Sequence, residues 1–393
     1  MIKNKKVVFF SGGRGLKNIL PKFLDKNYDI SVIVNSFDDG LSTGEIRKNF
    51  NMPGPSDLRK VQFLLNKNKF FKKLFDYRIN VKDKSLVYLE FERFVFNKSN
   101  TLFNIKFKNK ELIKFLRKYL KIFFLKTYNK KNKSFKNLFN YSLMNCLYAG
   151  IFLSTKNFSK TVKIINKNFN IKHEILPSCN GNFYLSALRD NNEILASEAE
   201  IVERRSNCRV KKIFITKKSL NNYKNFSNLS KKNKIKLMIE KNIKPKINSD
   251  VKKAILNADI IIYSPGTQYS SLYPTYLHNN LGKEIYSNKK SIKIFITNIG
   301  ADYETPNFKA SEYITNAYAA LNYSKKYKIN DFFDYNFINK NNNYKKNYVK
   351  IDNENLKKIN VKNIIKNFED KIHLGYHSGK IIFNEINDIY RKK

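Results

Sequence analysis

The chain has 393 residues, of which 42% are hydrophobic, so it is long enough for one large domain or two to three smaller ones. It carries 76 lysines and arginines against 32 aspartates and glutamates, a formal net charge of +44. No uncharged apolar run is long enough to span a membrane, and the amino-terminal segment leads into the strand-like VVFF rather than a signal peptide. These features predict a folded cytoplasmic protein.

The three cysteines are odd in number and far apart, at Cys146, Cys179 and Cys208. The sequence contains no CxxC pair, which argues against a disulfide framework or a zinc site. We therefore expect a reducing compartment.

The positive charge is a candidate signature of nucleic-acid binding, because basic surfaces release counterions from phosphate backbones. Lysine greatly outnumbers arginine, however, and the chain has only 13 glycines, 8 prolines and no tryptophan, a bias typical of AT-rich coding sequences. Base readout and bidentate phosphate contacts favour the arginine guanidinium. We interpret the charge mainly as a solvated lysine surface and expect no specific nucleic-acid partner.

The first third of the chain alternates strand and helix patterns. Residues 5–10 predict a strand, followed by the glycine turn SGGRG and a helix. Residues 30–35 predict a second strand, followed by a loop with two carboxylates and a helix from about Thr43. This alternation is typical of α/β proteins and predicts a Rossmann-like, doubly wound, mainly parallel sheet.

Between about residues 66 and 140 the pattern becomes helical. The stretch ELIKFLRKYLKIFFLKTY has apolar residues at three-and-four spacing with lysines between them, and we expect it to pack on its own core rather than on a membrane surface. Strand patterns return from about residue 171, and ADIIIYSPGTQYSSLYPTYL again predicts strand, glycine loop and helix. We expect one α/β domain over 1–325 that contains this basic helical insertion, and a Lys-, Asn- and Tyr-rich extension over 326–393.

Two of the loops that follow predicted strands are rich in glycine or hydroxyl side chains. They are SGGRG and SPGTQYSS, and open α/β sheets bind ligands at the carboxyl ends of such strands. Backbone N–H groups in these loops can approach an anion at a helix start, although either loop alone is also consistent with an ordinary helix cap. The residues expected to bind phosphate are Gly12, Gly13, Arg14, Gly15, Pro265, Gly266, Thr267, Ser270 and Ser271.

The loop between them, FDDGLSTGE, places Asp38 and Asp39 where the neighbouring loops are arranged for anions. Carboxylates beside phosphates usually indicate a divalent cation between them, or a base for an attacking hydroxyl. The alternative is that the pair only caps a turn.

Six motifs in this order resemble the CofD family. They are SGGRGLKNIL, VNSFDDGLSTGEIR, PGPSDLRK, MNCLYAG, ADIIIYSPGTQYSSLYP and ETPNFKASEYIT. That family includes the 2-phospho-L-lactate transferase of deazaflavin-cofactor biosynthesis and the YvcK-type gluconeogenesis factors, which bind UDP-sugars. The resemblance covers roughly residues 7–321, and the helical insertion is most similar to a longer, uncharacterised CofD-like branch.

The resemblance implies a transferase that moves a phospho-lactyl-type group from a GDP- or UDP-linked nucleoside diphosphate donor to a hydroxyl acceptor, with Mg²⁺ as cofactor. The implied residues are Asp38 and Asp39 as metal ligands and catalytic groups, Asp57 and Arg59 as catalytic groups, and Ser42, Thr43 and Asn145 in nucleotide or phosphate binding. The alternative function is a non-catalytic, UDP-sugar-binding regulatory factor of carbon metabolism or the cell envelope. We also expect a homo-oligomer.

Several positions depart from the family pattern. Arg14 replaces a small residue of the first loop, and Leu41 and Ser56 stand where the family has glycines. Met144 replaces a third glycine, before Asn145. Each lost glycine limits how closely the backbone approaches a ligand. Because the polar groups are better preserved than the glycines, the motifs support the ligand class more strongly than the reaction.

Structural alternatives stay open for some of these residues. Asp57 and Arg59 can simply pair with each other near a helix start, and Asn145 can be a hydrogen-bonded core residue. His373 and His377 have the spacing of a metal pair on a helix, but a glycine and no acidic residue lies between them, so we do not expect a metal there.

Overall fold

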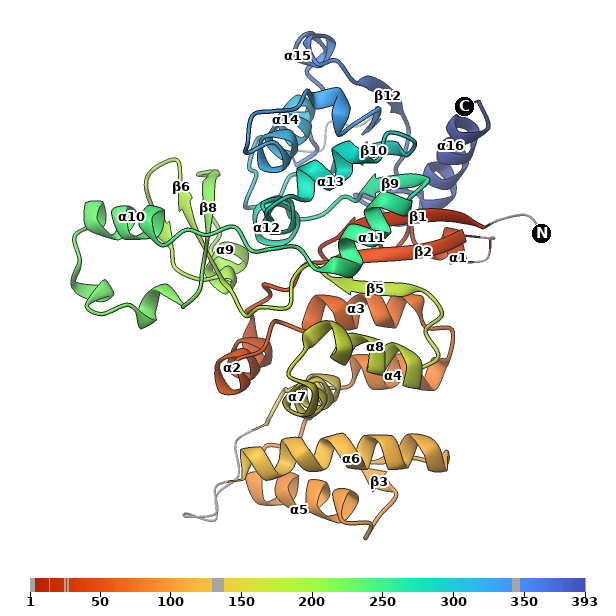
Figure 1. Cartoon of the computed structure of the whole chain (residues 1–393), viewed down its shortest axis with the longest axis vertical. Coiled ribbons are helices and arrows are strands. Elements are labelled where there is room, and N and C mark those ends of the chain that lie inside the picture. Colours follow the sequence, from red (N-terminus) through yellow and green to blue (C-terminus); the bar gives the residue numbers. More distant parts are fainter. Residues whose placement is uncertain are drawn as a thin grey trace. The chain divides into compact units, whose positions relative to one another are not determined.

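The structure is a computed structural model that describes residues 4–13, 15–24, 26, 28–128, 138–340 and 347–392 (Figure 1). The chain divides into two compact units. Unit 1 comprises 1–37, 176–179 and 183–393, and unit 2 comprises 38–175 and 180–182.

The main sheet has seven strands within the described residues, in the order β12-β11-β10-β9-β1-β2-β5. The strands are β1 (Lys5–Ser11), β2 (Tyr28–Val34), β5 (Glu174–Pro177), β9 (Ile260–Tyr263), β10 (Ile292–Ile296), β11 (Tyr335–Asn339) and β12 (Lys362–Lys366). The pairs from β12 through to β2 are parallel. Strand β5 carries the chain back from unit 2 into unit 1.

The order of the strands reverses at the centre of this sheet. From β1 the chain adds β2 and then β5 on one side, and β9 to β12 in succession on the other. This is the arrangement of a Rossmann-like fold, in which the crevice at the reversal point binds ligands. Phe10 of β1 lies opposite Ile33 of β2 and Tyr263 of β9, so the carboxyl ends of β1 and β9 meet at this point.

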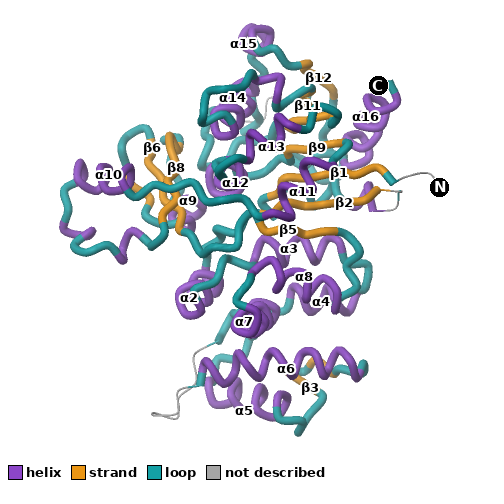
Figure 2. The backbone as a smooth tube through the Cα atoms, viewed as in Figure 1, coloured by secondary structure: helices purple, strands orange, loops and turns teal. Residues whose placement is uncertain are grey.

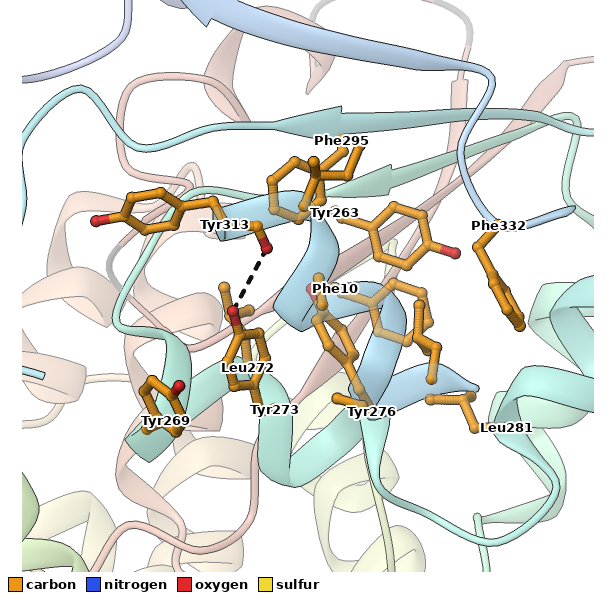
Figure 3. Close-up of a cluster of buried hydrophobic side chains, with 14 of the residues drawn as sticks. Phe10, Tyr263, Tyr269, Leu272, Tyr273, Tyr276, Leu281, Phe295, Tyr313 and Phe332 are labelled. Carbon is orange, nitrogen blue, oxygen red and sulfur yellow. Dashed lines mark hydrogen bonds between the residues drawn. The ribbon is translucent and has the colours of Figure 1, made fainter. Parts of the chain in front are cut away.

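Successive side chains of β1 point to opposite faces of the sheet. Because those on both faces are apolar, helices cover both faces. Phe9 packs edge-on against Phe23 of the first helix, and Phe23 in turn contacts Phe383 near the carboxyl end of the chain. Phe10 instead stacks on Tyr263 and contacts Tyr276. Figure 3 shows this second cluster. The helices of unit 1 are α1 (Pro21–Leu24), α9 (Glu198–Glu203), α10 (Lys231–Glu240), α11 (Ser249–Asn257), α12 (Tyr273–Tyr276), α13 (Leu281–Ser287), α14 (Ala310–Leu321), α15 (Asn353–Lys358) and α16 (Gly379–Arg391).

Unit 1 also contains a small antiparallel sheet in the order β7-β6-β8. Its strands are β6 (Tyr184–Arg189), β7 (Ile194–Leu195) and β8 (Val210–Thr216). The segment after residue 325, expected as an extension, supplies β11 and β12 to the main sheet and ends in α16.

Unit 2 is mainly helical (Figure 2). Its elements are α2 (Leu41–Phe50), α3 (Ser56–Leu65), α4 (Lys69–Asp76), α5 (Lys84–Val95), β3 (Thr101–Leu102), β4 (Ile105–Lys106), α6 (Lys110–Thr127), α7 (Leu143–Thr155) and α8 (Phe158–Asn168). Helix α6 buries its apolar stripe, which includes Leu116, Leu120 and Phe123, and leaves its lysines outside. It packs closely on α7, where a Cβ at Gly150 would lie 2.0 Å from the carbonyl oxygen of Tyr119.

The expected α/β class, with a Rossmann-like sheet and a helical insertion, is confirmed. The apolar stripe of α6 packs in a protein core, as predicted. Within the ranges that the structure describes, no helix is both long and apolar enough to cross a membrane.

Candidate functional site

The two glycine-containing loops of unit 1 pack directly against each other where the strand order reverses. A Cβ atom on Gly12 would lie 2.2 Å from the Cβ of Ser271, and one on Gly15 would lie 1.7 Å from the carbonyl oxygen of Pro265. Both distances are far below van der Waals contact, so any side chain here would push the loops apart. The sequence predicted each loop separately, and the structure brings them together.

Gly13 has a different role from its two neighbours. Its φ of 97° is a conformation that residues with a Cβ rarely adopt. Its N–H donates to Oγ of Ser11 at 3.0 Å, which closes a tight turn at the end of β1. The next residue, Arg14, was predicted to bind phosphate and lies outside the described residues.

The loop after β9 is held in shape by side chains. The amide of Asn298, which follows β10, accepts from the N–H of Gly266 and donates to its carbonyl oxygen, both at 2.9 Å. The hydroxyl of Thr267 lies 2.8 Å from that of Ser271 and 3.0 Å from that of Ser270. The three hydroxyls predicted to bind phosphate therefore form one connected group.

A buried carboxylate, Glu304, organises the same loop and was not among the predicted site residues. Its side chain accepts from the N–H groups of Tyr269 at 2.7 Å and Ser270 at 3.1 Å, and from the hydroxyl of Ser270. These donors begin the π-helical turn Gln268–Leu272, where backbone N–H groups attract negative charge. Part of the donor set expected for phosphate is thus already bound to an acid of the same chain.

Burial determines the protonation of Glu304, which is only 2% exposed. Burial, and secondarily the nearby charge of Asp302, raises the pKa of Glu304 to about 8, although the hydrogen bonds from Ser270 and Tyr269 oppose the shift. Glu304 belongs to the ETPNFKASEYIT motif. The sequence offered no signal for its partners, because they lie 34 and 35 residues away.

In unit 2, three of the motifs meet in one buried cluster. The hydroxyls of Thr43 on α2 and Ser56 on α3 are hydrogen-bonded to each other. The amide nitrogen of Asn145 on α7 lies 3.4 Å from the first and 3.5 Å from the second. The oxygen of the Asn145 amide has no hydrogen-bond partner within the described residues. Ser56, which replaces a family glycine, is therefore part of a polar network, and Ser42 is buried as well.

The carboxylates at the start of unit 2 are held by Arg47, another residue that was not predicted. Arg47 is fully buried, and its guanidinium lies 3.5 Å from the carboxylate of Asp39. It also donates to the backbone carbonyl of Asp38 at 3.2 Å and to the side chain of Asn182 at 3.0 and 3.1 Å. Burial, and secondarily the charge of Asp38, raises the pKa of Asp39, while Arg47 opposes the shift.

Asp57 and Arg59, the remaining predicted catalytic residues, both lie in α3 and are buried. The carboxylate of Asp57 pairs with Lys60 at 2.8 Å. A terminal nitrogen of Arg59 donates to the carbonyl of Phe75, and burial, followed by the charge of Arg78, lowers the pKa of Arg59. The predicted catalytic role of these two residues stays a prediction.

Nowhere in the described ranges do three or more His, Cys, Asp or Glu side chains form a group that could hold a metal ion. Mg²⁺ usually takes only one or two protein carboxylates and completes its shell with water and substrate phosphate. Asp38 and Asp39, which are adjacent and half-buried, fit that usage, and the pairing of Asp39 with Arg47 competes with it.

Comparison with known proteins now decides the family. The family model described as 2-phospho-L-lactate transferase CofD matches residues 7–369. The chain belongs to the CofD family. The match begins within β1 and extends past residue 325 through β12, so it reaches all seven strands described for the main sheet.

Curated and solved members resemble the chain over most of its length. It is 23% identical over 316 residues to the gluconeogenesis factor of Bacillus subtilis, covering 80% of this chain and 74% of that protein. It is 24% identical over 314 residues to the gluconeogenesis factor of Halalkalibacterium halodurans, covering 80% and 73%. A crystal structure of a UPF0052-family protein from Bacillus halodurans has a TM-score of 0.68 at 20% identity, covering 98% and 99% of the two chains, which establishes the common fold.

Proposed function

We propose that this CofD-family chain binds a nucleoside diphosphate derivative, GDP- or UDP-linked, at the two glycine loops of unit 1. The observation that carries the proposal is the close packing of these loops where the strand order reverses, since Rossmann-like folds bind phosphate groups there. Gly13 shapes the first loop through its φ of 97°, and Asn298 holds the second.

We further propose a transferase activity in which a phospho-lactyl-type group passes from the nucleotide to a hydroxyl acceptor. Asp38 and Asp39 would hold Mg²⁺, which when bound supplies positive charge to neutralise the diphosphate. Arg47 fixes the position of these two residues through the Asp39 carboxylate and the Asp38 carbonyl. In this proposal the protein acts mainly by positioning the reactants and by balancing charge.

A regulatory function is the second candidate, and two observations favour it. The curated relatives are named gluconeogenesis factors rather than transferases. In addition, Arg47 already balances the carboxylate of Asp39, one of the two groups on which metal-assisted transfer depends. In this case the chain binds a nucleotide-sugar without turnover and signals its presence to a partner.

Thermal unfolding with GDP, UDP-sugars and Mg²⁺ tests the ligand class. A specific ligand at 100 times its Kd stabilises the folded state by about 2.7 kcal/mol, so the midpoint rises with ligand concentration. A non-specific polyanion effect disappears as salt is added. Unchanged midpoints with every nucleotide, at low salt and with Mg²⁺ present, would contradict nucleotide binding.

Two substitutions test the metal and the reaction. Asp38→Asn and Asp39→Asn each remove a charge and keep the size of the side chain, while Asp388→Asn at an exposed position of α16 is the matched control. If the carboxylates hold Mg²⁺, nucleotide binding in the first two variants loses its Mg²⁺ dependence and any transfer rate falls by orders of magnitude. Identical Mg²⁺ titrations of all four proteins would leave the two aspartates as turn residues.

Release of nucleoside monophosphate separates the two candidates. Nucleotide binding without any release, over a range of hydroxyl acceptors, favours the regulatory function. The homo-oligomer expected from the sequence also stays a prediction, which sedimentation analysis of the whole chain can check.

A further inference from the structure

Unit 1 contains a pocket that involves only one residue of the predicted phosphate-binding segment 265–271, Tyr269. It has a volume of about 380 Å³, and its walls come from β8, the connection after α10, the π-helical turn with α12, and the end of α14. This volume lies within the size range of small-molecule sites. Three lysines line it, Lys211, Lys212 and Lys244, and none of its lining residues is acidic.

No carboxylate within the described part of the chain pairs with these lysines. Among the described residues, no side-chain hydrogen bond or ion pair is found for Lys211, Lys212 or Lys244. The ammonium groups of Lys212 and Lys244 instead lie over the rings of Phe214 and Tyr323, at 5.2 and 2.9 Å from the ring centroids. Burial, followed by the charge of Lys212, lowers the pKa of Lys244. The positive charges of these lysines repel one another, and no carboxylate lines the pocket. A bound anion would therefore lower the electrostatic energy of the site.

A local irregularity in β8 places two of the lysines at the pocket. Lys211 and Lys212 are consecutive, and consecutive side chains of a regular strand point to opposite faces. The pairing of β8 with β6 shifts here, since Lys212 lies opposite Leu188 and Val210 lies opposite Arg189. Lys211 is thus an inserted residue, and such bulges re-aim side chains and are common beside functional sites.

The inner wall of the pocket is mainly aromatic and belongs to the buried core. Tyr269, Tyr273 and Leu277 follow one another at four-residue spacing along one face of the π-helical turn and α12. The two tyrosine rings contact each other edge-on, and the hydroxyl of Tyr273 donates to the carbonyl of Tyr313, as Figure 3 shows. Both tyrosines are buried and belong to the main core, so the wall is formed before any ligand arrives.

We propose that this pocket binds a small organic anion: a phosphate or carboxylate carried on a compact apolar, preferably aromatic, body. The lysines attract the anionic group as point charges, a mode that serves phosphate and carboxylate alike. The aromatic wall accepts the apolar body and excludes water around it. This site is separate from the proposed nucleotide site and does not depend on it.

Calorimetric titration of the full chain at about physiological ionic strength tests the proposal, with phenyl phosphate and benzoate as probes and inorganic phosphate for comparison. We expect saturable binding of at least one aromatic anion, and binding of inorganic phosphate at least about tenfold weaker, because it lacks the apolar body. The two probes distinguish a phosphate from a carboxylate ligand.

Three variants assign the binding to this pocket. The double variant Lys212→Gln, Lys244→Gln should weaken the aromatic anion at least about tenfold, whereas the control Lys232→Gln, at an exposed position of α10, should not. Ala319→Phe places a ring in the pocket from an exposed position of α14, so it should also abolish binding while leaving the glycine loops intact. Unchanged affinity in the double variant and in Ala319→Phe, or no saturable binding of either probe up to about 10 mM, overturns the proposal.

Discussion

The second glycine loop of unit 1 and the acidic loop at the start of unit 2 each contact an acidic side chain, but the two acids are held by different partners. Glu304 is held by backbone N–H groups and one hydroxyl, and no lysine or arginine of the described residues is hydrogen-bonded to it. Asp39 is held by the guanidinium of Arg47, which is itself fully buried. The contacts of Glu304 fix the backbone of the loop after β9, whereas the contact with Arg47 fixes the position of the Asp39 carboxylate.

This difference has a physical consequence for how each region responds to its surroundings. Burial raises the pKa of Glu304 in unit 1 to about 8, so this side chain gains or loses its proton near neutral pH. In unit 2 the arginine cannot be deprotonated in a protein, so the charge next to Asp39 is permanent. The stability of unit 1 should therefore change with pH, and the stability of unit 2 should depend strongly on the side chain of Arg47.

Removing Arg47 should have the largest effect on stability. Arg47→Ala removes the guanidinium that pairs with Asp39 and donates to the carbonyl of Asp38 and the side chain of Asn182. Loss of one partner of a buried ion pair typically costs 3–5 kcal/mol, and we expect about 3 kcal/mol because Asp39 is partly exposed. Urea unfolding, followed by circular dichroism of the helices of unit 2, measures the loss.

Arg93→Ala is the matched control, since Arg93 lies exposed in α5 of the same unit. Its effect should stay within about 0.5 kcal/mol. Equal effects of the two substitutions would show that Arg47 does not organise the acidic loop.

The packing of the glycine loops should be the next most sensitive feature. In Gly15→Ala the new methyl group meets the carbonyl of Pro265, so one backbone must move, at a cost of about 2 kcal/mol. In Gly40→Ala, by contrast, no atom lies within 4 Å of the new Cβ, and the cost should be about 0.5 kcal/mol or less. Thermal unfolding of the two variants makes the comparison, and similar midpoints would contradict the close approach of the loops.

The sequence predicted the parts of unit 1 that depend on local pattern. Apolar runs followed by glycine turns specified β1, β9 and the loops after them, because strand, turn and helix signals extend over a few residues. It did not predict that Gly12 and Gly15 allow the two loops to pack closely, since Ser271 and Pro265 lie more than 240 positions away in the chain. The local pattern therefore predicts the loops but not their close packing, and phosphate binding by their glycines stays a prediction.

Unit 2 shows a different limit of sequence analysis. The motifs containing Thr43, Ser56 and Asn145 were recognised, but their contact joins three helices and has no local signature. Arg47 and Glu304 both lie inside motifs of the family resemblance, but a buried charge is identified by its partners rather than by its neighbours in sequence. Those partners become visible only in the folded chain.

The pH dependence of unit 1 should follow from Glu304. The unfolded carboxyl has a pKa near 4.5 and the folded one near 8, so the folded protein binds the extra proton and stability falls as pH rises between these values. Burial lowers the pKa of His278 and His377 to about 4. Because unfolding lets these two histidines bind protons, they lower the stability of the folded protein as pH falls below about 6.5. Between pH 6.5 and 8 the acid therefore dominates, and the loss should be about 1 to 2 kcal/mol for one proton.

Glu304→Gln tests this assignment, because the amide keeps the size of the side chain and cannot titrate. Urea midpoints measured from pH 6.5 to 8 should fall in the wild type and stay nearly level in the variant. The neighbouring acid, Asp302, also has a pKa raised by burial, so Asp302→Asn is the necessary companion measurement. A slope that persists in Glu304→Gln and vanishes in Asp302→Asn would move the titration to the neighbour.

The weakest and least specific interaction is expected for nucleic acid at the exposed lysine surface outside both regions, where solvent and counterions balance the charge. A net charge of +44 attracts any polyanion at low ionic strength, but exposed lysines release counterions without distinguishing one base sequence from another. Nucleic-acid affinity should therefore fall steeply and linearly on a logarithmic salt scale, to a Kd in the range of about 10⁻⁶ to 10⁻⁴ M at physiological salt. Fluorescence anisotropy with two unrelated oligonucleotides at several salt concentrations measures both the slope and the preference. A complex that keeps a preference for one sequence at physiological salt would mean that part of this surface forms specific contacts. The exposed lysines would then differ from the acids of the two loops less than we infer, because they too would have a specific partner.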